Sequence, residues 1–170
     1  MGILNATPDS FSDGGKIKTP QDAIAQAEYM IANGVDLIDV GGESTRPGAD
    51  PVSLQEELDR VLPVIESLKD CGVPLSIDTY KAETMRQALH AGANCVNDIW
   101  ALRQAGALDA VLGSSNCGIV LMHMQRDPQT MQFDPEYVDV ISEVSKFLNE
   151  RAELLMQSGV HHDRIAIDPG

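Results

Sequence analysis

Acidic and amide side chains recur directly after short apolar runs, as expected where parallel strands deliver functional groups to their carboxyl ends. Such strands are covered on both faces and read as continuously apolar, so a polar group at the end needs a ligand or a hydrogen-bond partner. The residues in these places are Asn5, Asp78, Asn97 with Asp98, and Asp168. Any one of them could simply cap the helix that follows. Several together favour a shared ligand, because unpaired carboxylates within a few ångströms of one another would raise each other's pKa.

The side chains of Asp78, Asn97 and Asp168 suit the edge of a planar ligand that carries ring N–H and amino donors. A carboxylate accepts two such hydrogen bonds, and an amide both accepts and donates. Asn5 offers a neutral oxygen instead, which suits a hard cation. Because Mg²⁺ keeps several waters and binds through few protein oxygens plus substrate phosphates, one amide could suffice as its ligand.

A second polar loop, residues 41–48, carries Thr45 and Arg46. A guanidinium binds phosphate and carboxylate groups in a forked geometry, so Arg46 is a natural anion ligand in this acidic chain. A surface salt bridge is the alternative for Arg46.

Five further residues flank the strand ends or lie opposite them. Lys81 and Trp100 follow two of the expected strands, and the sequence assigns them no role. His123 follows another strand, where it either lines the pocket or packs as a buried or solvated imidazole. The pair 161–162 precedes the last strand and reads as a solvated turn at the opposite face.

Strand and helix patterns alternate along the whole chain. Strands are expected at 2–4, 35–40, 73–77, 93–96, 118–122 and 164–167, and helices at 20–33, 53–68, 80–91, 104–112 and 135–158. Helix-start signals occur at Thr19-Pro20, at Ser53 and at Asp134-Pro135. The last helix is predicted to bury one face, made of Tyr137, Ile141, Val144, Leu148, Ala152 and Leu155.

Strict alternation of strand and helix implies a parallel α/β architecture, either an open doubly wound sheet or a (β/α)8 TIM barrel. The loops favour the barrel, because helix-to-strand connections are short and strand-to-helix connections are long and polar. No GxGxxG or GxxxxGK[ST] motif follows a strand. Since a barrel needs eight strands and only six are expected, we interpret residues 1–170 as a single incomplete domain of a larger enzyme that lacks strands 7 and 8.

The composition excludes several classes of partner. With 170 residues, 43% of them hydrophobic, and a formal net charge of -14, the chain fits a globular domain that nucleic acid and anionic membranes would repel. The three cysteines are odd in number and lie in apolar surroundings, which predicts free thiols. With no leader or membrane-length apolar run, we expect a cytoplasmic protein.

Six segments of the chain resemble dihydropteroate synthases, the folate-pathway enzymes that join a pterin to p-aminobenzoate. The resemblance runs through the whole chain in order and spacing, and the first two segments are highly specific. The segments are residues 2–15, 39–48, 76–81, 97–98, 121–124 and 167–170. In this family the strand-end pocket would hold the pterin.

The resemblance implies a role for each candidate. Asn5 would bind Mg²⁺ as the cofactor, and Thr45 and Arg46 would lie on a mobile loop that serves the diphosphate and catalysis. Pterin ligands would be Asp78, Asn97, Met122 and Asp168. A first mobile loop would close over p-aminobenzoate with Thr7, Pro8, Ser10, Phe11 and Asp13.

The implied reaction is displacement of pyrophosphate from 6-hydroxymethyl-7,8-dihydropterin diphosphate by the arylamine, which sulfonamides resemble. We hypothesise that Asp13 stabilises the positive charge that develops on the pterin methylene carbon. A homodimer is expected for the full-length protein. Because the family's later lysine, arginine and histidine ligands are missing, we expect the 170-residue chain alone to be inactive.

Two alternatives remain. A methyltetrahydrofolate-to-corrinoid methyltransferase shares the fold and the pterin-binding acids, but it would not need the loop at 7–13. A degenerate, non-catalytic pterin-binding paralogue is the other, and the intact candidates at the strand ends argue against it.

Overall fold

A computed structural model describes residues 1–6, 19–44 and 51–170, and these alternate between strand and helix as expected. In chain order the elements are β1 (Gly2–Asn5), α1 (Pro20–Ala32), β2 (Ile38–Gly41), α2 (Leu54–Leu68), β3 (Leu75–Asp78), α3 (Ala82–Ala91), β4 (Cys95–Asp98), α4 (Ala107–Leu112), β5 (Gly118–Met122), α5 (Val140–Gln157), the 3-10 turn η2 (His162–Arg164) and β6 (Ile165–Asp168).

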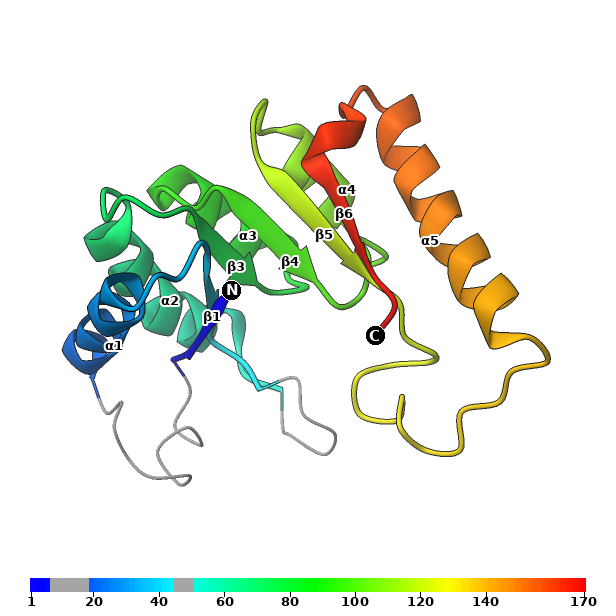
Figure 1. The fold of residues 1–170 in the computed structure, drawn as a ribbon, viewed down its shortest axis with the longest axis horizontal. Coiled ribbons are helices and arrows are strands. Elements are labelled where there is room, and N and C mark those ends of the chain that lie inside the picture. Colours follow the sequence, from blue (N-terminus) through cyan, green and yellow to red (C-terminus); the bar gives the residue numbers. More distant parts are fainter. Residues whose placement is uncertain (7–18, 45–50) are drawn as a thin grey trace.

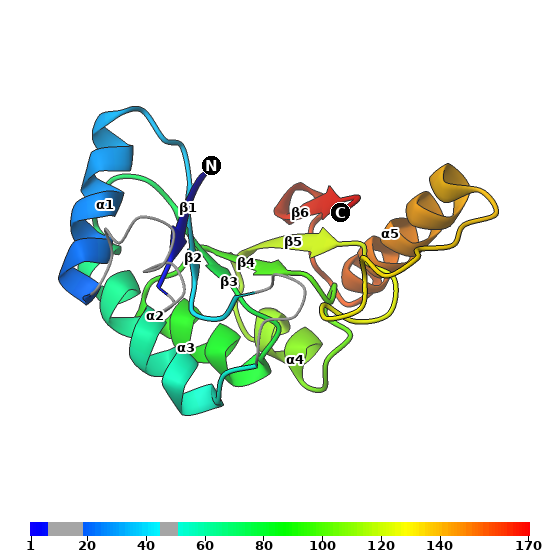
Figure 2. The same ribbon diagram turned by 90° about the horizontal axis from the view of Figure 1, so that it is seen from below.

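The six strands form one parallel sheet in the order of the sequence. The sheet is curved, and α1 to α4 cover its convex side (Figures 1 and 2). In β1 to β5, apolar residues at alternate strand positions are buried between sheet and helices, and these are Leu4, Ile38, Val40, Leu75, Ile77, Val96, Ile119 and Leu121. The alternate residues therefore face the concave side, as the interior positions of a barrel do.

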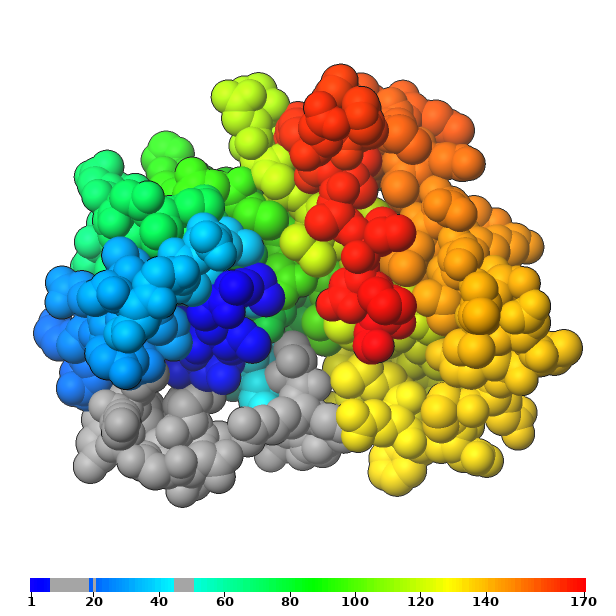
Figure 3. All heavy atoms as spheres, viewed as in Figure 1, coloured from blue at the N-terminus to red at the C-terminus, as the bar shows by residue number. Residues whose placement is uncertain are grey.

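The first and last strands are edges within the described part of the chain, because β1 pairs with β2 alone and β6 with β5 alone. Ile3 on β1 is 60% exposed, and Ile167 on β6 is 55% exposed. Figure 3 shows atoms of the intervening strands between the dark blue β1 and the red β6. The strands thus have the arrangement of six consecutive units of a (β/α)8 barrel.

Three helix ends share one kind of cap, and two of these caps explain why β2 and β4 begin later than the apolar runs predict. After α1, α3 and α5, Val35, Ala93 and Val160 donate their backbone N–H back to the helix, to Met30, Ala88 and Leu155. The preceding Gly34, Gly92 and Gly159 have φ values of 83°, 124° and 93°, which complete the Schellman geometry. Val35 and Ala93, which the pattern assigns to strands, are therefore still part of a helix cap. Four of the described strands extend to a polar residue at the carboxyl end, namely β1, β3, β4 and β6 with Asn5, Asp78, Asp98 and Asp168.

Two of the predicted helix starts are confirmed. Thr19 accepts a hydrogen bond from the N–H of Asp22, whose carboxylate accepts one from the N–H of Thr19. Ser53 accepts from the N–H of Glu56. These side chains satisfy N–H groups that the first turn of a helix leaves unpaired.

The predicted start of the last helix at Asp134-Pro135 is wrong. Asp134 has a left-handed φ of 44°, and Asp139 is the N-cap, accepting from the N–H and hydroxyl of Ser142. Helix α5 begins at Val140 because the preceding segment is held as a loop, in which the side chain of Gln125 donates to the carbonyl of Glu136.

The predicted buried face of α5 is correct only in part. Leu148 and Leu155 are buried, and Val144 and Ala152 pack against the core. Ile141, in contrast, lies in the first turn of the helix and is 76% exposed.

Helix α4 starts at Ala107 rather than Gln104, because the chain first makes a left-handed turn. Ala101 and Leu102 have φ values of 49° and 59°, a conformation that costs about 1 kcal/mol or more per non-glycine residue. The buried carboxylate of Asp98 accepts from the N–H groups of Trp100 and Leu102, both at 2.8 Å. Arg151 on α5 donates to the carbonyls of Ala101 and Leu102 at 2.7 and 3.0 Å.

Two other expectations concern the cysteines and membrane-spanning helices. The three cysteines are free, and Cys117 is buried. Among the described helices, none has the length and apolar character needed to cross a membrane.

Replacing Arg151 by Met should lower the free energy of unfolding by about 2 kcal/mol, because two charge-assisted hydrogen bonds to a strained turn are lost. Urea unfolding of the full-length protein measures the change. Lys146→Met, at a position whose side chain is 76% exposed on the same helix, is the matched control and should change stability by less than about 0.5 kcal/mol. Equal effects of the two substitutions would contradict this role for Arg151.

Candidate functional site

The register of the sheet brings four strand-end residues into one row. Asn5, Gly41, Asp78 and Asn97 are paired in sequence across β1 to β4. A Cβ atom at Gly41 would lie 3.6 Å from the amide oxygen of Asn5 and 3.6 Å from Oδ2 of Asp78. Because glycine has no side chain, the space between these two oxygens is not filled by residue 41.

A second carboxylate lies one layer deeper. Asp39 on β2 is 3% exposed, and its Oδ2 accepts a hydrogen bond of 3.0 Å from the side-chain amide of Asn97. In the described part of the chain, Oδ1 of Asp39 and Oδ1 of Asp78 are both buried without a hydrogen-bond partner. Buried acceptors are normally satisfied, so two orphaned oxygens at one end of a sheet indicate a ligand or ordered water.

The carboxyl group of Asp78 is strongly perturbed. The pKa of Asp78 is raised to about 8. Burial is the largest cause, and the negative charges of Asp39, Asp98, Glu57 and Glu43 contribute the rest. Asp78 is therefore largely protonated at neutral pH without a ligand. A ligand that donates hydrogen bonds to this carboxylate must first displace its proton.

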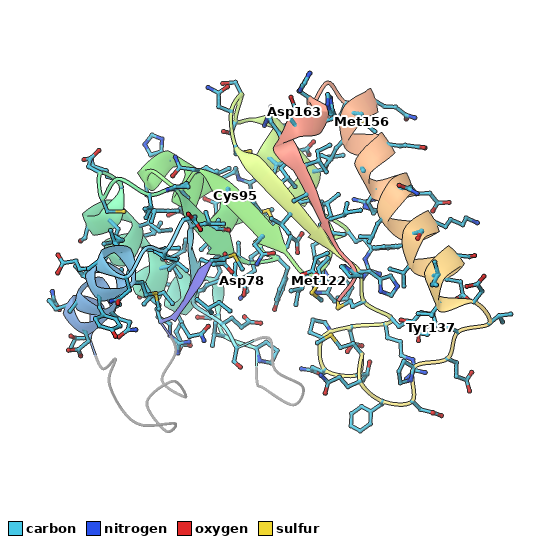
Figure 4. The ribbon with its side chains drawn as sticks, in the orientation of Figure 1. Asp78, Cys95, Met122, Tyr137, Met156 and Asp163 are labelled. Carbon is cyan, nitrogen blue, oxygen red and sulfur yellow. The ribbon has the colours of Figure 1, made fainter. Side chains whose placement is uncertain are left out.

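Strands β5 and β6 contribute a second pair at the same edge. Met122 is opposite Asp168 in the register, and the backbone carbonyl of Asp168 accepts from the N–H of His123 at 2.8 Å. The carboxylate of Asp168 is exposed and accepts from the N–H of Gly170 at 2.9 Å. Figure 4 shows Asp78 and Met122 towards the carboxyl-terminal edge, whereas Asp163 lies at the opposite edge.

The two remaining histidine predictions are now resolved. His123 is 8% exposed and packs against the rings of Tyr137 and Phe147, with centroids 6.0 and 5.2 Å away. Burial lowers the pKa of His123, so it is a neutral, packed imidazole. His161 and His162 are exposed beside Asp163.

Trp100 lies beside a different cavity. Its ring meets that of Tyr80 edge to face at 6.5 Å between centroids. Both line a cavity of about 260 Å³ together with Glu43, Pro51, Gln104, Asp127, Pro128 and Gln129. Because Asp78, Asn97 and Asp168 do not line it, this cavity is separate from the row of strand-end acids.

The structure thus gathers Asn5, Asp78 and Asn97 in one row, and it pairs Met122 with Asp168 on the neighbouring strands. The other predicted site residues lie outside the described residues. These are Thr7, Pro8, Ser10, Phe11, Asp13, Thr45 and Arg46.

Asp39 is a candidate that the sequence reasoning missed. It lies inside an apolar strand rather than after one, two residues before Gly41. An acid at a central position of a buried strand is itself a signal, because it costs free energy unless it has a partner. Its position also gives it the same orientation as Gly41, since strand side chains alternate with a period of two.

A family model described as "Pterin binding enzyme" matches residues 1–170, the whole chain. The chain belongs to the pterin-binding enzyme family. This agrees with a row of carboxylate and amide acceptors at the strand ends.

Among known members of the pterin-binding family, the chain is 47% identical to the dihydropteroate synthases of Synechocystis and of Escherichia coli K12. All of the chain aligns, and it spans about 60% of the length of these relatives (59% and 60%).

Solved structures of the same kind share the fold. The dihydropteroate synthase of Burkholderia cenocepacia, complexed with 7,8-dihydropteroate, is 54% identical with a TM-score of 0.88, and the whole chain covers 57% of it. The Yersinia pestis synthase with a sulfonamide drug is 46% identical with a TM-score of 0.94, and 62% of it is covered. The Xanthomonas albilineans synthase with 4-aminobenzoic acid is 50% identical with a TM-score of 0.89, and 60% of it is covered.

Replacing Asp78 by Asn should stabilise the full-length protein increasingly as the pH rises. Below about pH 4 the carboxyl is protonated in both the folded and unfolded states, so the charge costs nothing. Between about pH 4 and 8 only the unfolded state ionises, so the wild type loses stability that the variant keeps. The gain in the free energy of unfolding should reach a few kcal/mol, since each unit by which the pKa of Asp78 is raised corresponds to about 1.4 kcal/mol.

Urea unfolding at pH 5, 7 and 9 measures this gain. Asp36→Asn, at an exposed position before β2, is the control and should give no such trend. A gain that does not rise with pH would show that the carboxyl of Asp78 is not destabilised by burial.

Proposed function

We propose that the full-length protein is a dihydropteroate synthase, which condenses 6-hydroxymethyl-7,8-dihydropterin diphosphate with p-aminobenzoate. The observation that carries the proposal is the pair of orphaned carboxylate oxygens on Asp39 and Asp78, in a chain 47% identical to two synthases along its whole length. The relatives whose structures hold dihydropteroate or 4-aminobenzoic acid support these substrates.

The pterin is proposed to bind across the strand ends. Its flat ring carries amino and N–H donors along one edge, and Asp78 and Asp168 provide carboxylate acceptors for them. Asn97 is held by its bond to Asp39, which fixes the orientation of its amide. Met122 lies beside Asp168 and offers an adaptable apolar surface for the ring.

Magnesium is proposed as the cofactor, with Asn5 as its protein ligand. The amide oxygen of Asn5 lies beside Gly41, where no side chain of residue 41 covers it, and Mg²⁺ needs only few protein oxygens because it keeps several waters. When bound, the ion would neutralise charge on the diphosphate oxygens. Thr45 and Arg46, which directly follow Ser44 in the sequence, are proposed to bind the same diphosphate.

In the proposed reaction, the arylamine nitrogen attacks the methylene carbon of the pterin. A C–N bond forms, the C–O bond to the diphosphate breaks, and its electron pair leaves with pyrophosphate. The amine then loses a proton to water or to a nearby base. Thr7, Pro8, Ser10 and Phe11 are proposed to contact the arylamine, as the resemblance implies.

Two further properties remain proposals. A cytoplasmic location follows from the composition, and a homodimer of the full-length protein from the resemblance. We also propose that the 170-residue chain is inactive by itself, because it spans only about 60% of the length of its curated relatives.

The function is tested by mixing the full-length protein with both substrates and Mg²⁺ and measuring pyrophosphate. Release should require both substrates and the metal, and Asn5→Ala should raise the Mg²⁺ concentration needed for half-maximal rate at least tenfold. A methyltransferase would release no pyrophosphate, and a non-catalytic paralogue would bind the pterin without turnover. Either outcome would refute the proposal.

The role proposed for Asp13 makes a separate prediction. Replacing it by Asn should lower kcat at least a hundredfold, because the negative charge that stabilises the developing cation is removed. Affinity for the pterin should change less than threefold, as measured by titration without p-aminobenzoate. An equal loss in kcat and in pterin affinity would show that Asp13 acts in binding alone.

A further inference from the structure

Lys81 carries a network of buried polar contacts that lies directly behind the pterin site. Its ammonium group forms an ion pair with Glu43, which follows β2, and another of 2.9 Å with Glu57 on α2. The lysine side chain is 18% exposed, and that of Glu57 is 1% exposed. We call Glu43, Glu57, Thr79, Tyr80, Lys81 and Thr84 the Lys81 network.

Every carboxylate oxygen in the Lys81 network accepts at least one hydrogen bond. Glu57 accepts from the hydroxyls of Thr79 at 2.7 Å and Thr84 at 3.0 Å. Glu43 accepts from the hydroxyl of Tyr80 at 2.7 Å and from the N–H of Val52 at 3.2 Å. Such a fully satisfied network has one low-energy arrangement, so it fixes the backbone segments that carry its members.

Those segments end at the proposed ligand site. Thr79 directly follows Asp78, and Glu43 lies two residues after Gly41. A close approach of α2 to Gly42 adds to the constraint, because a Cβ there would lie 2.7 Å from a methyl carbon of Val61. The network therefore joins the carboxyl ends of β2 and β3.

Charge makes Lys81 indispensable to the network. With one ammonium and two carboxylates, the network has a net charge of about -1. Without the ammonium, two carboxylates would face each other in a poorly hydrated place, near the further acids Asp39, Asp78 and Asp98. Breaking a buried ion pair from one side is strongly unfavourable for this reason.

We propose that Lys81 is a positioning residue for the pterin site: through Glu43 and Glu57 it holds the ends of β2 and β3 together, and so sets the separation of Gly41 and Asp78 without touching the ligand. This inference rests on the proposed function for its ligand, but the joining of the two strand ends can be measured without one.

The test uses the full-length protein with the variants Lys81→Met, Lys81→Arg, Glu43→Gln and the double variant Lys81→Met/Glu43→Gln. The exposed Lys146→Met is the control. Hydrogen exchange of residues 38–44 and 75–81 reports on the strand ends without ligand. Titration with 6-hydroxymethylpterin reports on the site.

Lys81→Met should accelerate exchange in both segments and weaken pterin binding at least tenfold, and Lys81→Arg should recover most of the loss. The double variant should bind no worse than Lys81→Met, because its net charge returns to that of the wild type. If Lys81→Met does not fold, Glu43→Gln must still accelerate exchange in both segments and weaken binding severalfold.

Three results would overturn the proposal. Unchanged exchange with weakened binding would mean that Lys81 contacts the ligand directly. Losses that multiply in the double variant would mean that Lys81 and Glu43 act independently, and unchanged binding would remove the link to the site. If the wild type binds no pterin while exchange responds as predicted, the proposed function fails and the joining of the strand ends stands.

Discussion

Desolvation of acidic side chains at the carboxyl ends of β2, β3 and β4 is the constraint on which the site depends. Asp39 and Asp98 are buried, and the pKa of Asp78 is raised to about 8. Placing several acids together reduces stability, so the arrangement has to be supported by neighbouring groups. Asn97 supports Asp39, the backbone of a strained turn supports Asp98, and the Lys81 network supports the segment after Asp78.

Two contacts that order the strand ends come from helices. Glu57 reaches the end of β3 from α2, and Arg151 reaches the turn after β4 from α5. The helices therefore do more than cover the sheet, since two of them contribute charges that order the strand-to-helix connections. This division explains why the ligand-facing acids remain free to accept hydrogen bonds from a ligand. The groups that secure the loops are different residues.

Much of the fold follows from the sequence because apolar strands, caps and glycine stops are local signals. The parallel α/β alternation and the caps at Thr19 and Ser53 are of this kind. The start of α5 was not predictable from its cap pattern, because Asp134-Pro135 and Asp139 are both plausible caps and contacts such as that of Gln125 with Glu136 decide between them. The turn at Ala101 and Leu102 also escaped prediction, since nothing local requires non-glycine residues to be left-handed.

The strand-end candidates could be found because each follows an apolar run, and the register then placed Asn5, Asp78 and Asn97 side by side. Asp39 and Lys81 could not be assigned in this way. Asp39 lies within its strand, and the importance of Lys81 comes from two glutamates that are 38 and 24 residues away in the sequence. Such long-range pairing of charges has no periodic pattern that sequence reasoning could detect.

The central claim is that an ionised Asp78 accepts hydrogen bonds from a pterin. Calorimetric titration of the full-length protein with 6-hydroxymethylpterin at pH 7, in buffers of different ionisation enthalpy, counts the protons exchanged on binding. Because the pKa of the free Asp78 is about 8, the wild type should release close to one proton per pterin, and Asp78→Asn should release none and bind more weakly. Binding without proton release by the wild type, or equal release by both proteins, would contradict the account.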